Sequence, residues 1–228
     1  MPKIVDHDCR RAEIAALTLE VIRTVGIENA TIRGIGKRGG LSMGVLTHYF
    51  KSKDELLAFA FRWLSDRCFF ELDGLLAAIP PGLERLEVAL EAVFPKPGEP
   101  VSIALWMSLW ERATRNPAFA REHRAYYARW RRYVRTFLRE AVAQQQIPAT
   151  LRITDATDLL VAAVDGLWIG SALEPRRFAA ARRRALVRQL VDTVTQRRHR
   201  AVLPRRARAP RRAPRRARGQ ARAPRVPH

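Results

Sequence analysis

The chain has 228 residues, of which 47% are hydrophobic and 28% charged, and its formal net charge is +20 at pH 7. This length allows one large domain or two small ones, and the hydrophobic share is sufficient for a core. No run of 18 or more apolar residues is present, and the first ten residues lack the apolar segment of a secretion signal, so we expect no membrane span and a cytoplasmic location. The two cysteines, Cys9 and Cys68, form no disulfide or metal-binding pattern.

The positive charge is unevenly distributed along the chain. Residues 197–228 contain thirteen arginines and no acidic residue, and they consist mostly of Arg, Ala and Pro. Such a composition cannot bury enough apolar surface to fold, so we expect a disordered tail. Two interpretations remain open: an arm that adds non-specific contacts to nucleic-acid phosphates, or a segment without an evolved role, of the kind that a shifted reading frame through GC-rich DNA encodes.

The first predicted elements are three helices separated by short breaks. Apolar residues recur at helical spacing over residues 10–25, and Gly26 ends that helix. Thr31 is placed to cap a short second helix, which ends at Gly39-Gly40 because glycine tolerates the left-handed conformation of a tight turn. Ser42 is placed to cap a third short helix that ends near Tyr49.

Helical periodicity continues through the rest of the chain up to residue 196. Ser52 and Glu55 form a capping box that opens a long helix. Pro80-Pro81-Gly82 breaks the chain, and Asn116-Pro117 combines an N-cap with proline at the first helical position. No strand alternation is present, so the sequence predicts an all-α fold. The later helices are expected at residues 83–93, 101–114, 117–144, 155–173 and 175–195.

The first three helices predict a helix-turn-helix. A short, glycine-bearing break between the second and third helices lets the third enter the major groove of DNA. No acidic residue lies between positions 31 and 53, and the basic residues there suit a polyanion, although a plain helical hairpin with a solvated basic face remains an alternative. These basic residues are Arg33, Lys37, Arg38, Lys51 and Lys53.

The segment from Ala30 to Leu57, ATIRGIGKRGGLSMGVLTHYFKSKDELL, closely resembles the signature of the tetracycline-repressor (TetR) family. The resemblance covers about residues 10–60. Met1-Pro2-Lys3, Thr47-His48-Tyr49-Phe50 and Asp165-Gly166-Leu167-Trp168 also resemble the BetI type, the choline-responsive repressors of glycine betaine synthesis. The resemblance implies a DNA-binding domain at residues 8–68 and a ligand-binding and dimerisation domain at residues 69–196, followed by the tail at 197–228.

The resemblance also implies which residues face DNA. The first residues of the third helix would lie in the groove, polar residues after them would contact bases or phosphates, and Lys53 would hold a phosphate at the start of the next helix. Gly36 and Gly39 stand where the family usually has alanine, and each is expected to cost about 1 kcal/mol of helix stability. The predicted DNA-binding residues are Thr31, Arg33, Ser42, Met43, Gly44, Val45, Thr47, His48, Tyr49 and Lys53.

The C-terminal half contains the chemistry needed to bind a quaternary ammonium such as choline. Aromatic faces attract such cations, and Glu111 and Asp165 are candidate counter-charges. The alternatives are that the aromatic residues are ordinary core and that Asp165 pairs with an arginine. The predicted ligand-binding residues are Trp106, Trp110, Tyr127, Asp165 and Trp168.

The last two helices are expected to form a homodimer, as in the family. An apolar stripe on the final helix suits packing against a partner, and a two-fold dimer would match a palindromic operator in double-stranded DNA. The stripe comprises Val187, Leu190, Val191 and Val194.

The sequence contains no nucleophile beside a base, no phosphate-binding glycine loop and no metal-ligand spacing. We therefore expect neither an enzyme nor a bound cofactor or metal. The predicted function is a repressor that a small molecule, choline, releases from the genes of glycine betaine synthesis. Two alternatives remain: a TetR-family repressor that senses another ligand, and a non-specific nucleic-acid-binding protein acting through its basic tail.

Overall fold

The computed structural model describes residues 7–94 and 103–196. These ranges contain nine α-helices and no β-strand, which confirms the all-α fold. The basic tail, residues 197–228, lies outside the described residues. The helices are α1 (His7–Val25), α2 (Ile32–Gly39), α3 (Met43–Tyr49), α4 (Lys53–Leu76), α5 (Leu83–Ala92), α6 (Ile103–Arg115), α7 (Pro117–Ala143), α8 (Ile153–Leu173) and α9 (Ala180–Gln196).

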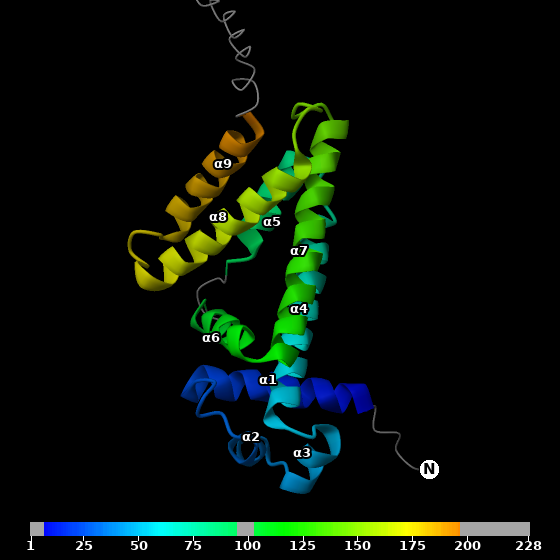
Figure 1. The fold of residues 1–228 in the computed structure, drawn as a ribbon, viewed down its shortest axis with the longest axis vertical. Coiled ribbons are helices and arrows are strands. Elements are labelled where there is room, and N and C mark those ends of the chain that lie inside the picture. The colour runs from blue at the N-terminus through cyan, green and yellow to red at the C-terminus, as the bar shows by residue number, and fades with distance from the viewer. Residues whose placement is uncertain (1–6, 95–102, 197–228) are drawn as a thin grey trace, which may run out of the picture.

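The helices form two groups that share α4 (Figure 1). Helices α1, α2 and α3 lie at one end of the molecule, and α5, α8 and α9 lie towards the other. Helix α4 packs against α1 at its beginning and then runs beside α7, while α6 packs against α7 and α8. The expected domain boundary between residues 68 and 69 falls inside α4, so a displacement of α4 would move both groups.

Local signals in the sequence account for several of the helix starts. Thr31, Ser52 and Asn116 each accept a hydrogen bond from the amide three residues further on, at 3.0, 3.1 and 3.0 Å. These caps confirm the predicted beginnings of α2, α4 and α7. Helix α9 begins at Ala180 rather than at residue 175, because the chain first makes a turn whose Phe178 ring packs closely over Gly170 of α8.

The inner face of α9 differs from its prediction. Val187 and Val191 are completely buried within a single chain, where α9 packs against α5 and α8. The prediction that this stripe faces a partner is therefore wrong for Val187 and Val191, while Leu190 and Val194 are half-buried. Helical spacing shows that a helix has an apolar face, but it does not show whether the same chain or a second copy covers that face.

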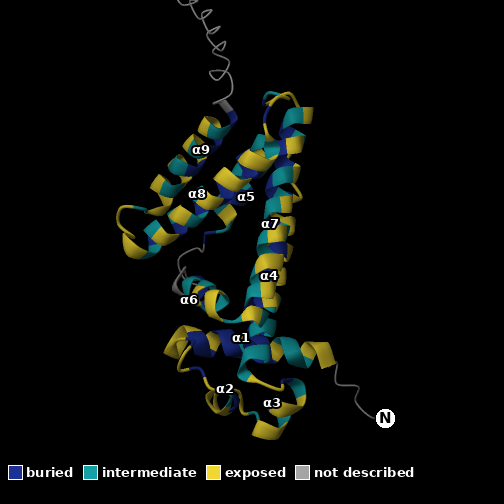
Figure 2. Ribbon diagram, in the orientation of Figure 1, coloured by how far each residue is buried: buried dark blue, intermediate teal, exposed yellow. Residues whose placement is uncertain are grey.

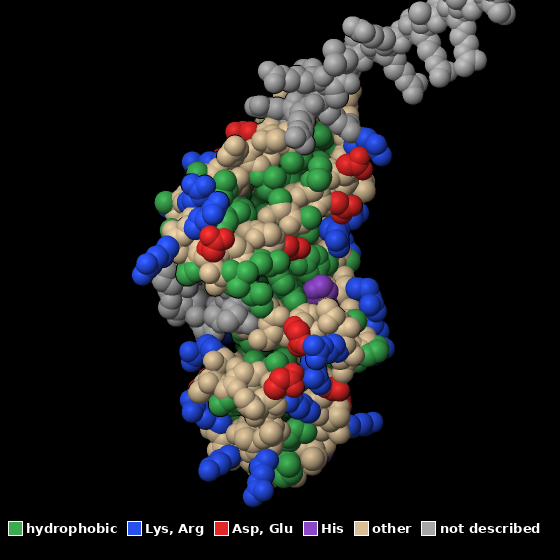
Figure 3. Space-filling model, turned by 60° about the vertical axis from the view of Figure 1, so that its left-hand side comes forward, with side chains coloured by type: hydrophobic (Ala, Val, Ile, Leu, Met, Phe, Trp, Pro, Cys, Tyr) green, Lys and Arg blue, Asp and Glu red, His purple; other side chains and the backbone are tan. Residues whose placement is uncertain are grey.

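Helix α8 instead exposes apolar residues. Leu159 is 58% exposed and Leu173 is 72% exposed, and they belong to a stripe in which intervals of three and four residues alternate (Figure 2). Hydrophobic side chains gather on the face of the molecule that includes this helix (Figure 3). We call this the α8 stripe; it comprises Leu159, Ala162, Gly166, Ile169 and Leu173.

By length and composition alone, α8 also meets the criteria for a membrane-crossing helix, with a mean hydropathy of 1.4. It is the one such helix in the part of the chain that the structure describes. Helix α8 packs against α6, α7 and α9, and 39% of its apolar window is buried. A core helix with a second face free for a partner has the same composition, so this feature is weak evidence for a membrane.

Candidate DNA-binding and ligand-binding sites

Helices α2 and α3 form a helix-turn-helix through local backbone interactions. Gly40 ends α2 with φ 62°, in the left-handed region that glycine adopts without strain. Ser42 then caps α3 by accepting a hydrogen bond from the Val45 amide at 3.3 Å. The short turn between them fixes the direction in which α3 leaves α2, as a recognition helix requires.

The inner side of α3 is anchored in the core. Leu46 and Phe50 are 1% exposed, and the Phe50 ring lies 5.4 Å from that of Phe59 on α4. The Arg11 guanidinium of α1 lies 4.7 Å from the Phe50 ring centroid and 4.4 Å from that of Phe59. These contacts hold α3 between α1 and α4 and leave its opposite side in solvent.

Most of the predicted DNA-binding residues lie on that solvent side, at the end of the molecule where Lys and Arg side chains project (Figure 3). Val45 and Tyr49 are half-buried, and the Tyr49 ring lies 4.7 Å from that of His7. The Thr47 hydroxyl donates to the Met43 carbonyl at 3.0 Å, which leaves its lone pairs for an outside donor. The exposed members are Thr31, Arg33, Ser42, Met43, Gly44, Thr47 and His48.

Lys53 has a structural partner that the sequence did not indicate. Its ammonium donates to the carbonyls of Ile27 and Glu28 at 3.0 and 3.1 Å, and so ties the start of α4 to the turn after α1. A lysine has three donors, so one remains for a phosphate. Lys51 is exposed and has no ion pair with a described residue. Its ammonium is therefore freer than that of Lys53 to bind a phosphate.

Close packing against backbone explains one of the two unusual glycines of α2, Gly36. A Cβ on Gly36 would lie 2.8 Å from the Leu41 carbonyl oxygen and 3.0 Å from Leu46 Cδ1. A Cβ on Gly39 would lie 2.2 Å from Leu17 Cδ2. The expectation that these glycines only cost helix stability is therefore incomplete, because Gly36 also lets the backbone after α2 approach closely.

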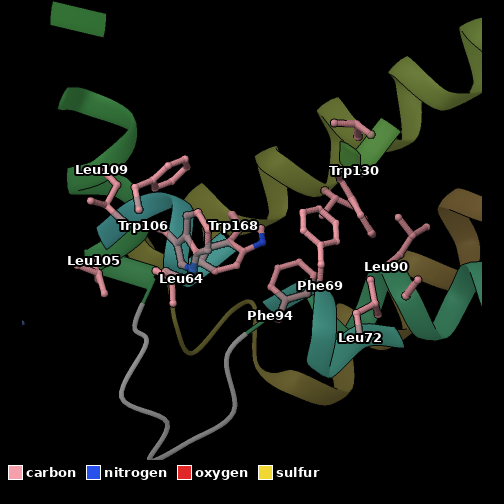
Figure 4. Packing of buried hydrophobic residues seen from close by; sticks show 14 of the residues in the cluster. Leu64, Phe69, Leu72, Leu90, Phe94, Leu105, Trp106, Leu109, Trp130 and Trp168 are labelled. Atoms are coloured by element: carbon pink, nitrogen blue, oxygen red, sulfur yellow. The ribbon is translucent and has the colours of Figure 1, made fainter. Parts of the chain in front are cut away.

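The second site is a cluster of aromatic residues from α6, α7 and α8. The Trp168 ring lies 6.4 Å from that of Trp106 and 6.1 Å from that of Trp110, and Phe94 stacks on Trp168 at 5.6 Å (Figure 4). All five predicted ligand-binding residues line one small cavity, which we call the aromatic cage: Trp106, Trp110, Tyr127, Asp165 and Trp168. Four residues outside the predicted set also line it: Val93, Tyr126, Trp130 and Val164.

Asp165 supplies the negative charge of the cage. Its carboxylate accepts a hydrogen bond from the Tyr127 hydroxyl at 2.9 Å, and the nearby Arg131 pairs with Asp158 instead. The alternative of an Asp165–arginine pair is therefore wrong. Burial raises the pKa of Asp165 to about 6, against the opposing effects of the Tyr127 hydrogen bond and of Arg131. Glu111, the other candidate counter-charge, is 45% exposed and pairs with Arg115 at 2.9 Å.

The cage is nearly closed in this structure. Its free volume is about 20 Å³, which is room for one water molecule. The Trp110 indole N–H is buried and has no acceptor in the part of the chain described. An unpaired buried donor is costly, so a ligand that carries both a positive charge and a hydrogen-bond acceptor would satisfy Trp110 and Asp165 together.

A polar contact joins the cage side of the molecule to the DNA-binding end. Arg112, near the end of α6, pairs with Asp54 at the start of α4 and lies 3.7 Å from Glu28 in the turn after α1. The Asn116 side-chain amide donates to the same Asp54 at 2.8 Å. We call this group the α6–α4 clamp. The sequence reasoning did not identify it, because its partners lie about 60 residues apart.

Comparisons with known proteins agree with this two-part arrangement. Residues 14–59 match the family described as "Bacterial regulatory proteins, tetR family", and residues 82–196 match "BetI-type transcriptional repressor, C-terminal". The HTH-type transcriptional regulator PksA of Bacillus subtilis (strain 168) is 32% identical over 211 residues, which cover 87% of this chain and 100% of PksA. The HTH-type transcriptional regulator BetI of Escherichia coli (strain K12) is 28% identical over 195 residues, 84% of this chain and 96% of BetI.

The fold also matches solved structures. A transcriptional regulator from Saccharomonospora viridis in complex with choline superimposes with a TM-score of 0.73 at 23% identity, over 81% of this chain and 96% of that one. The relatives named here are transcription regulators and not enzymes. The chain therefore belongs to the TetR family and is a ligand-responsive transcriptional repressor with a BetI-type C-terminal domain.

Proposed function

We propose that α3 is the recognition helix of this repressor and that a palindromic operator is its target. The support is geometric: Met43, Gly44 and Thr47 lie on the exposed side of a helix whose other side is anchored in the core. Arg33, Lys37 and Lys51 surround them and are exposed, so they would supply contacts to phosphates. The division into a DNA-binding domain at 8–68 and a sensing domain at 69–196 stays a prediction.

The α8 stripe is the proposed dimer surface. Its alternating intervals of three and four residues suit helix-against-helix packing, and Ala162 and Gly166 at its centre would let two helices approach closely. TetR-family regulators form dimers, and a second copy would cover the Leu159 and Leu173 side chains that a single chain leaves exposed. Two recognition helices would then meet two half-sites of one operator.

The proposed effector is a small quaternary ammonium compound, and choline fits the cage chemistry. The observation that carries this proposal is Asp165, a carboxylate enclosed by tryptophan and tyrosine rings and without a cationic partner among the described residues. Aromatic rings and a carboxylate attract a quaternary ammonium, while the hydroxyl of choline could accept from Trp110. A structural neighbour with the same fold, the regulator from Saccharomonospora viridis, was solved in complex with choline.

Binding would have to open the cage, because about 20 Å³ cannot hold choline. Helix α6 carries two cage residues, Trp106 and Trp110, and also Arg112 of the α6–α4 clamp. A ligand that displaces α6 would therefore pull on Asp54 and shift the start of α4, which directly follows the recognition helix. Such a shift would change the spacing of the two recognition helices and release the operator.

Titration calorimetry tests the effector. Choline should bind, and Trp110→Ala should weaken binding by about 0.5–2 kcal/mol, the range for cation–π contacts. Asp165→Asn should weaken it further, whereas Trp63→Ala on α4, which does not line the cage, should have no effect. Equal heats for choline and its neutral isostere 3,3-dimethylbutanol would show that charge is not recognised, and the regulator would then sense a different class of ligand.

A paired substitution tests the coupling. Arg112→Gln should leave the dissociation constant of choline unchanged but reduce the effect of choline on operator affinity to less than about fivefold, the lower end of allosteric coupling. Arg115→Gln is the matched control, since Arg115 lies on the same helix and, among the described residues, pairs with Glu111 of that helix. An unaltered choline response in Arg112→Gln would rule out the clamp as the route.

A further inference from the structure

A second, much larger cavity lies beside the aromatic cage. Its volume is about 620 Å³, within the range of sites for small organic ligands, and it is bounded by α4, α5, α7 and α9. Trp106, Tyr126 and Trp130 form a wall shared with the cage, and Phe69, Leu72 and Phe94, which are labelled in Figure 4, also line the cavity. Three residues of the aromatic cage do not line this cavity: Trp110, Tyr127 and Asp165.

The α9 side of the cavity is positively charged. Arg183 and Arg184 both line it, and neither forms an ion pair with a described carboxylate. Arg183 donates to the Phe178 carbonyl at 3.0 Å, and its guanidinium lies 5.0 Å from the Phe94 ring centroid. Of the two acidic residues that line the cavity, Glu71 already pairs with Arg67 at 2.9 Å, which leaves Glu91 alone against two cations.

The environment of Arg183 favours an incoming anion. Burial and the neighbouring charge of Arg184 lower the pKa of Arg183, so both effects oppose its positive charge. An anionic group between the two side chains would offset the repulsion between them. The interior beyond these arginines is formed by apolar side chains, among them Leu72, Val88 and Val187, and it would shelter an apolar chain rather than a polar one.

We propose that this cavity binds an amphipathic carboxylate, a fatty-acid-like molecule whose head lies at Arg183 and Arg184 and whose tail lies against Phe69, Leu72 and Phe94. The inference goes beyond the proposed function, because the aromatic cage would bind a small cation through different residues. A molecule in this cavity would also touch Trp106, so it would act on the same helix as the cage ligand.

Calorimetry on the full chain with dodecanoate and dodecanol tests the proposal. Dodecanoate should bind at least tenfold more tightly than dodecanol, and each two-carbon extension from octanoate to dodecanoate should strengthen binding about 15-fold. The double substitution Arg183→Gln, Arg184→Gln should abolish the preference for the carboxylate. Its matched control is Arg176→Gln, Arg177→Gln, which removes the same charge from residues that do not line the cavity.

Arg183 also holds the turn before α9, so substituting it changes the stability of that helix as well. A second test therefore uses a substitution outside α9 that fills the cavity. Ala92→Trp adds an indole from an exposed position on the cavity lining and should weaken dodecanoate and dodecanol alike by at least tenfold, while choline binding stays unchanged. The proposal is overturned if dodecanoate does not bind up to its solubility limit, if both ligands bind equally to the wild type, or if Ala92→Trp leaves both affinities unaltered. Choline titrated into the same samples reports separately on the cage.

Discussion

The recognition helix and the aromatic cage present their chemistry in different ways. The DNA-facing residues lie within a run of about two dozen consecutive positions, from Thr31 to Lys53, and most are exposed. The cage residues come from three helices and enclose about 20 Å³. The first site can contact a partner without rearrangement, whereas the second would have to open to admit a ligand.

The difference extends to how each site is supported. Ser42 and Gly40 fix the recognition helix through contacts within a few residues, and Phe50 anchors it. The cage depends on contacts such as Tyr127–Asp165, which span 38 residues. Substitutions at the DNA-binding end should therefore separate readily into those that affect folding and those that affect binding, while substitutions in the C-terminal half will tend to affect both.

The largest expected effect comes from the buried face of α9. Val191→Asp should lower the free energy of unfolding by about 3–5 kcal/mol, because it places an unpaired charge in a fully buried site. Ile169→Asp, on the α8 stripe, should instead leave a folded monomer. Urea unfolding and sedimentation distinguish the two variants. A folded, monomeric Val191→Asp chain would contradict the assignment of this face to the interior.

The next largest expected loss of stability is that of Gly36→Ala, at the DNA-binding end. Its methyl group would press on the Leu41 carbonyl at a cost of about 1–3 kcal/mol, against a gain of about 1 kcal/mol in helix propensity, so we expect a net loss of stability and weaker operator binding. Gly44→Ala is the matched control, because a Cβ there has room. It should raise the thermal midpoint slightly, through the same helix propensity, and lower operator affinity. A more stable Gly36→Ala variant would show that the close packing is relieved cheaply.

The cage should show a pH dependence set by Asp165. Burial raises the pKa of Asp165 from 3.8 to about 6, so the carboxylate is charged above pH 6 and choline affinity should fall about tenfold per unit below it. The same shift means that the folded chain binds this proton more tightly than the unfolded chain does. The contribution of Asp165 to stability therefore falls as pH rises from about 4 to about 6. Asp165→Asn should abolish both trends between pH 5 and 7, and a choline affinity that does not vary with pH would contradict the role of Asp165.

The elements that could be predicted from the sequence are those determined by residues close to one another in the chain. The caps at Thr31, Ser42 and Asn116 and the break at Gly40 are decided by neighbours within four residues, so the helix-turn-helix could be predicted. All five predicted cage residues line one cavity, but Val93, Tyr126, Trp130 and Val164, which also line it, were not predicted, because the cavity is formed where separate helices pack together.

Contacts between distant segments were not predictable in the same way. The partner of Asp165 proved to be Tyr127 rather than an arginine, and the α6–α4 clamp was missed. The stripe on α9 was assigned to a partner although α5 and α8 cover Val187 and Val191. In each case the residue type was informative, but the choice of neighbour depended on how helices far apart in sequence pack together.

The smallest expected effects are those of substituting Lys51 and Lys53, the two lysines that follow α3. Lys51→Ala should leave stability unchanged and reduce the slope of log affinity against log salt concentration by about 1, because one phosphate contact is lost. Lys53→Ala should cost about 1 kcal/mol of stability as well, since its ammonium holds the carbonyls of Ile27 and Glu28. Fluorescence anisotropy with operator DNA at several salt concentrations, paired with thermal unfolding, measures both. If the slope is unchanged in Lys53→Ala while stability falls, Lys53 only supports the fold; if it is unchanged in both variants, the basic edge of α3 does not contact the operator backbone.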